Sequence, residues 1–153
     1  MEPLQILAVA ALIPALAAIF YILFAKPESG NAILAAMLSA GFAAFTAVQI
    51  YTDGVVMFWT NHTLNLTGIQ VWWDLVICVV VGLYFLAPRA RAVGMNIVPW
   101  GLFVACTASI GLLAMVARLF WLENMVEAKA DTPTKDTPAA NPPATPAAKP
   151  AKA

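Results

Sequence analysis

The chain has 153 residues, of which 62% are hydrophobic and only 10% are charged, and its mean hydropathy is +0.83. A water-soluble domain of this size needs more charge to cover its surface, so the composition indicates a membrane protein. Eight basic residues balance eight acidic ones. This neutrality disfavours nucleic acid as a partner.

Four apolar segments, residues 3–25, 32–51, 69–88 and 97–122, are each about as long as the roughly 20 residues that a helix needs to cross a bilayer. Lipid offers the backbone no hydrogen bonds, so helices are expected. The first segment lacks a basic flank and is longer than a signal-peptide core, which favours a span. The sequence predicts an all-α membrane protein, a four-transmembrane-helix bundle over residues 1–125.

Two further segments flank or connect these spans. Val55 to Thr60 is apolar but too short to cross a bilayer, which predicts an interfacial or re-entrant segment between the second and third helices. Residues 126–153 are rich in Ala, Pro and Lys and have no apolar face to bury. This composition predicts a disordered tail.

Positive charges beside the spans predict the orientation. Lys26 lies in the first connection, and Arg89 and Arg91 lie in the third, whereas residues 52–68 contain no Lys or Arg. The first and third connections are therefore expected in the cytoplasm of a bacterium. Both termini would then lie on the periplasmic side of the inner membrane.

Small residues recur every fourth position in the spans, a spacing that lets membrane helices approach closely. The second span carries two such rows, and the fourth span carries one. A second row exceeds what one neighbouring helix requires, so it favours contact with another membrane subunit or with an apolar ligand such as lipid, quinone or pigment. No cofactor is otherwise indicated. The rows are Ala35, Ser39, Ala43 and Ala47, then Ala36, Ala40 and Ala44, then Gly101, Ala105 and Ser109.

Ionisable residues inside a membrane are costly and usually have a partner. In the predicted topology Asp74 and Arg118 lie near the same surface, which predicts an ion pair, with Glu123, His62 and Asn61 around it. Two interpretations stay open, a clasp between the third and fourth spans, and a site for a small solute, a headgroup or a proton. A lone histidine with scattered carboxylates predicts no metal site.

The two cysteines, Cys78 and Cys106, lie in the middle of the third and fourth spans. Thiols in such positions usually act as small buried apolar groups. The sequence therefore predicts a packing role for both cysteines and no disulfide.

A pattern of single residues runs through the second half of the chain: Phe58-Trp59-Thr60-Asn61, Gly68, Asp74-Leu75, Arg89 with Arg91, Gly94, Trp100, Ser109 with Gly111, and Arg118 to Glu123. By this pattern, residues 55–123 resemble a small bacterial membrane family, domain of unknown function 2834. The resemblance implies a bacterial inner-membrane protein and carries over no activity, cofactor or partner.

Three functions are compatible with these observations. We expect first a non-catalytic accessory or assembly subunit of a larger bacterial membrane complex, bound to membrane lipids and other subunits through its small-residue faces. The second is an enzyme acting on a lipid or isoprenoid in the outer leaflet, with Asp74, His62 or Glu123 as acid or base. The third is a small-solute or proton transporter, which needs a polar path across the bilayer.

Overall fold

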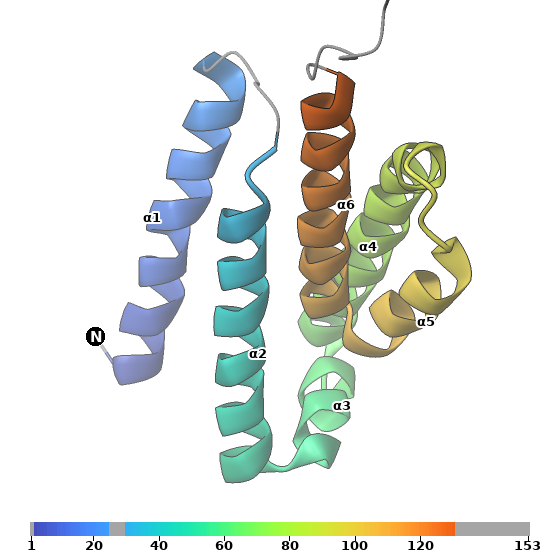
Figure 1. Ribbon diagram of the computed structural model, residues 1–153. Helices are drawn as coiled ribbons and strands as arrows, with labels where there is room; N and C mark the ends of the chain where they lie inside the picture. The colour runs from blue at the N-terminus through green and yellow to red at the C-terminus, as the bar shows by residue number, and fades with distance from the viewer. Residues whose placement is uncertain (1, 25–29, 131–153) are drawn as a thin grey trace, which may run out of the picture.

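The computed structural model describes residues 2–24 and 30–130, and within them the chain is helical (Figure 1). Four of its helices are long and apolar enough to cross a membrane, which confirms the predicted fold class. These four are α1 (Pro3–Phe24), α2 (Ala32–Asp53), α4 (Leu66–Ala92) and α6 (Ser109–Ala130). Two shorter helices, α3 (Val55–Thr63) and α5 (Ile97–Thr107), connect them.

Asparagine side chains begin three of the helices. The Oδ1 atoms of Asn31, Asn65 and Asn96 accept hydrogen bonds from backbone N–H groups in the first turns of α2, α4 and α5. These bonds satisfy donors that a helix leaves unpaired at its start. Gly54 separates α2 from α3 with a φ of 81°, a conformation that glycine adopts without strain.

Helix α6 lies at the centre of the packing, with α2 on one side and α4 and α5 on the other (Figure 1). The buried core gathers around it and includes Val104, Met115 and Leu119. Helix α2 runs antiparallel to α6, because Ser39 contacts Ile110 while Gly30, just before α2, contacts Asn124.

Helix α4 runs parallel to α6. Gly82 packs against Leu112, and further along both helices Arg89 contacts Glu123. The carboxyl ends of α4 and α6 therefore lie at the same end of the bundle.

Helix α1 differs from the other long helices because it has no buried residue. It lies beside α2 in Figure 1, on the side away from α6. Pro14 lies inside it and has no N–H, so the carbonyl of Ala10 does not receive its helical hydrogen bond. In a bilayer such a carbonyl is usually satisfied by a neighbouring helix or a polar side chain.

The segment 97–122, predicted as one continuous span, is divided at Ala108, which has a φ of 49°. Gly111 allows the reversal, because a side chain there would lie 2.8 Å from the Val104 Cα and 2.6 Å from the Thr107 Oγ1. The Ser39 hydroxyl donates a hydrogen bond to the Ile110 carbonyl at 2.9 Å beside the turn. The resulting hairpin buries Val104 against α6, and this burial favours the reversal over a straight helix.

This reversal changes the relation between the two ends of the chain. In Figure 1, α6 ends beside the end of α4, whereas Pro3 begins α1 at the opposite end of the bundle. The sequence had predicted that the third connection and the carboxyl end lie on opposite sides. The difference arises because α5 is too short to cross, at 11 residues, and α6 then returns toward the end from which α5 entered.

The other helix boundaries lie closer to those predicted from the sequence. The apolar segment at Val55 begins a helix that continues to Thr63, α4 extends beyond residue 88 to Ala92, and α6 extends to Ala130. The described part of the predicted tail, residues 126–130, is therefore helical. Lys26 and residues 131–153 lie outside the described residues.

Candidate functional site

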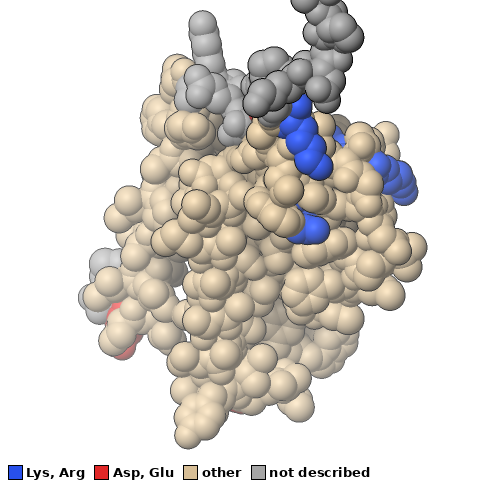
Figure 2. Space-filling view, in the orientation of Figure 1, with Lys and Arg blue, Asp and Glu red and all other residues tan. Residues whose placement is uncertain are grey.

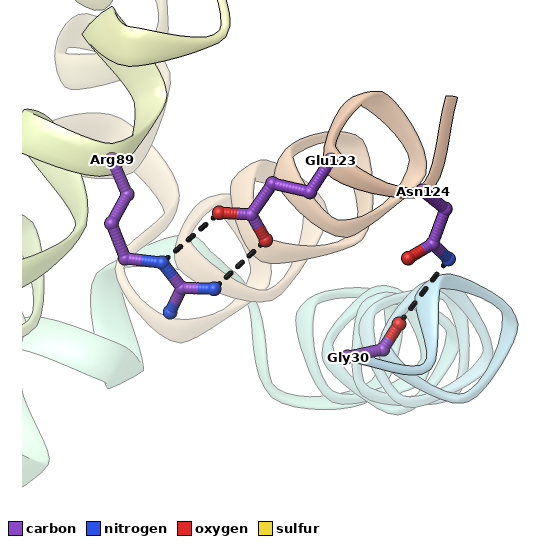
Figure 3. Close-up of polar contacts among 4 residues, drawn as sticks. All are labelled: Gly30, Arg89, Glu123 and Asn124. Carbon is purple, nitrogen blue, oxygen red and sulfur yellow. Dashed lines mark hydrogen bonds and ion pairs between the residues drawn. The ribbon is translucent and has the colours of Figure 1, made fainter. Parts of the chain in front are cut away.

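An ion pair joins α4 to α6 (Figure 3). The Arg89 Nε donates to Glu123 Oε1 at 3.1 Å, and its Nη2 donates to Oε2 at 2.8 Å. This two-bond geometry matches the planar guanidinium to the carboxylate. The side chains are 52% and 27% exposed, so the pair stabilises the fold by only about 1 kcal/mol and acts mainly to fix the register of the helices.

The start of α2 meets α6 at the same end of the bundle. The Asn124 Nδ2 donates to the Gly30 carbonyl at 3.5 Å (Figure 3). A side chain at Gly30 would overlap the ring of Phe120, and that ring also lies 5.6 Å from the guanidinium carbon of Arg89. Contacts between segments far apart in the sequence thus join α4, α6 and the start of α2 at this end of the bundle.

Asp74 and Arg118, the residues predicted to pair, are not in contact. Asp74 lies 15 residues before Arg89 on α4, and Arg118 lies five residues before Glu123 on α6. Since Arg89 and Glu123 are level and the two helices run parallel, at 1.5 Å per residue Asp74 and Arg118 differ in depth by roughly 15 Å. The pairing would need antiparallel helices, which the reversal at Ala108 prevents.

Asp74 instead lies on the exposed face of α4. Its carboxylate accepts a weak hydrogen bond from the Cys78 thiol at a donor to acceptor distance of 4.0 Å. A shallow depression of about 360 Å³ surrounds it, lined by Gln70, Val71, Trp73, Asp74 and Ile77. All five residues belong to α4, so the depression is a feature of one helix surface and not a cleft between helices.

Arg118 lies on an exposed face of α6. Its guanidinium carbon lies 4.2 Å from the centre of the Trp121 ring, which is a cation–π contact. Glu123, which the sequence grouped with Arg118, is bound to Arg89 instead.

His62 and Asn61 lie on α3, near the start of α4. The His62 ring packs 4.8 Å from the Phe58 ring and 5.9 Å from the Trp72 ring, and its Nδ1 lies 2.6 Å from the Phe58 carbonyl oxygen. The His62 ring therefore takes part in the packing of α3 on α4. The five residues of the predicted cluster thus lie in several separate places and form no single site.

The small-residue rows have different surroundings. In the first row of α2, Ala35 and Ser39 are buried, Ala43 is half-buried and Ala47 is exposed, so this row faces α6. The second row is exposed throughout, at Ala36, Ala40 and Ala44. The row Gly101, Ala105 and Ser109 does not share one helix, because α5 ends at Thr107 and Ser109 begins α6.

Both cysteines are free thiols. Both are also exposed, in contrast to the predicted role as buried packing residues. Cys78 lies on the outer face of α4, and Cys106 lies on the outer face of the short α5, so neither reaches the core around α6. Residues 2–24 and 30–130 contain no group of three His, Cys, Asp or Glu side chains that could hold a metal ion.

No family model, curated protein or solved structure matches the chain.

Proposed function

We propose that the protein is a non-catalytic accessory or assembly subunit of a larger bacterial membrane complex. The observation that carries this proposal is the uncovered small-residue row of α2. Ala35 and Ser39 already serve the contact with α6, yet Ala36, Ala40 and Ala44 form a second row that no described helix covers. Small residues on a membrane helix allow a partner helix to approach closely.

Helix α1 supports the same proposal. It buries none of its 22 residues against the rest of the chain, and Pro14 leaves a carbonyl inside the helix without its usual donor. Lipid can cover the apolar side chains of α1, but it cannot donate a hydrogen bond to that carbonyl. A helix from another subunit can supply both packing and a polar group.

The experiment is purification from native membranes in a mild detergent, followed by native gel electrophoresis of the wild type and of Ala40→Leu. The wild type is expected to migrate with a large complex, and Ala40→Leu is expected to migrate alone while accumulating to the same level. Ala105→Leu is the matched control, because it enlarges an exposed small residue on α5. A wild type that migrates alone would contradict the proposal, as would equal effects of the two variants.

The geometry gives less support to the two alternatives. An enzyme using Asp74, His62 or Glu123 together with Arg118 needs these side chains around one substrate, and they lie at separate places. A transporter needs a continuous polar path, and the core around α6 consists of apolar residues such as Val104, Met115 and Leu119.

The proposed location is the bacterial inner membrane, in keeping with the resemblance of residues 55–123 to domain of unknown function 2834. The proposed orientation places the carboxyl end of α6 in the cytoplasm and the start of α1 outside. Figure 2 shows Lys and Arg side chains gathered toward the end of the bundle where α4 and α6 finish. The described basic residues are Arg89, Arg91, Arg118 and Lys129.

This orientation differs from the predicted one in the position of the carboxyl end, and it brings the lysines of the tail into agreement with the excess of positive charge on the cytoplasmic side. Labelling with a membrane-impermeant maleimide tests it in variants that lack Cys78 and Cys106. Thr67→Cys is expected to react in intact cells, and Arg91→Cys only after the cells are opened; both positions are exposed and lie at opposite ends of α4. The reverse pattern would contradict the orientation.

A further inference from the structure

Two arginines near the same end of the bundle have different surroundings. Arg89 donates two hydrogen bonds to Glu123, so its charge is neutralised within the chain. Arg118 forms no hydrogen bond and no ion pair with residues 2–24 or 30–130, and its contact is with the ring of Trp121. A guanidinium has five N–H donors, and an aromatic ring beneath it leaves the donors at its edge free.

Arg118 also lies on a face of α6 that the other helices leave open. Helix α2 covers the face that contains Ile110 and Asn124, and α4 packs on the face that contains Leu112 and Glu123. Helix α5 packs on the side that contains Gly111, Met115 and Leu119. Arg118, Trp121 and Met125 follow each other between the α2 and α5 sides of the helix, by the period of 3.6 residues per turn. Both Arg118 and Trp121 are exposed, the latter by 47%.

We expect the edge of the bilayer near the level of Glu123, and Arg118 lies five residues, or roughly 7.5 Å, before that level on α6. Trp121 lies two residues before Glu123, at the end of the bundle where α4 finishes, and the contact with its ring draws the Arg118 guanidinium toward that end. Indole rings favour the membrane interface, and arginine side chains within a span extend toward the headgroups. At such a depth the guanidinium would reach the phosphate groups of lipids.

We propose that Arg118 and Trp121 form a binding site for the headgroup of an anionic phospholipid. The edge of the guanidinium donates two hydrogen bonds to the phosphate oxygens, while the indole ring holds the guanidinium plane in place. Arginine suits this role because its planar fork matches two oxygens of one phosphate, which the ammonium of lysine does not.

The test uses the full-length protein purified in detergent and titrated with phosphatidylglycerol, with bound lipid counted by native mass spectrometry. The wild type is expected to retain phosphatidylglycerol in preference to phosphatidylcholine. Arg118→Gln is expected to weaken phosphatidylglycerol binding about tenfold, the size of a lost charge-assisted contact. Arg91→Gln removes the same charge from an exposed position that has no ring contact within the described part of the chain, and it is expected to change binding by no more than about twofold.

Two further arms keep the test decisive. Arg118→Lys keeps the charge and the fold but loses the planar fork, so it is expected to bind phosphatidylglycerol more weakly than the wild type does. Inorganic phosphate is expected not to displace the lipid. Equal losses in Arg118→Gln and Arg91→Gln, full binding by Arg118→Lys, or displacement by inorganic phosphate would each overturn the lipid site. The purified chain is tested without a partner, so the result is independent of the subunit proposal.

Discussion

Helices α1 and α6 have the same length of 22 residues, yet they differ completely in how they are packed. Helix α6 buries Gly111, Met115 and Leu119 and contacts three other helices, whereas α1 buries nothing. Helix α1 is also the more apolar of the two, because it contains no charged residue, whereas α6 contains Arg118, Glu123, Glu127 and Lys129. In this chain, therefore, apolar character alone does not predict burial within the bundle, because the more apolar helix is the one that buries nothing.

The largest expected effect separates a closely packed glycine from an open one. Gly111→Ala places a methyl group against the backbone of Val104, at 2.8 Å from its Cα, and is expected to lower the free energy of unfolding by about 1–3 kcal/mol. Gly41→Ala on α2 is the matched control, since a Cβ there meets nothing within 4 Å. It is expected to be neutral or to stabilise by up to about 1 kcal/mol through helix propensity.

Unfolding of both glycine variants can be followed by circular dichroism in detergent micelles. Equal unfolding midpoints for Gly111→Ala and Gly41→Ala would contradict the predicted difference between the closely packed glycine and the open one. That result would mean that α5 and α6 do not approach each other closely at the reversal.

A smaller effect is expected at the contact between α2 and α6. The Ser39 hydroxyl is buried and donates to the Ile110 carbonyl, so Ser39→Ala removes a hydrogen bond between helices, worth about 0.6 kcal/mol in a membrane protein. Thr52→Ala is the control, because the Thr52 hydroxyl bonds only within its own helix, to the Val48 and Gln49 carbonyls. Equal loss of thermal stability in both variants would indicate that Ser39 does not join the two helices.

Sequence reasoning predicted the helical class and three of the four long helices within a few residues at most boundaries, because long apolar runs in lipid have few other solutions. It could not predict the reversal at Ala108. Neither glycine nor proline occupies that position. The conformation depends on the close approach of Gly111 to Val104 and on the bond between Ser39 and Ile110, which are 71 residues apart in the sequence.

The error in the ion pair follows from the missed reversal. A continuous span over 97–122 places Arg118 under the same surface as Asp74, while the hairpin places Glu123 beside Arg89 instead. Both arginines and both carboxylates were visible in the sequence, but their pairing depends on the relative direction of α4 and α6. No local pattern in either helix reports that direction.

The parallel arrangement of α4 and α6 can be tested directly by cross-linking in native membranes, with Cys78 and Cys106 replaced by serine. The double variant Arg89→Cys with Glu123→Cys is expected to be joined by a short bismaleimide within one chain. Asp74→Cys with Arg118→Cys is expected to remain unjoined, because the two positions differ in depth by roughly 15 Å. Efficient cross-linking of residues 74 and 118, with none between 89 and 123, would contradict the account.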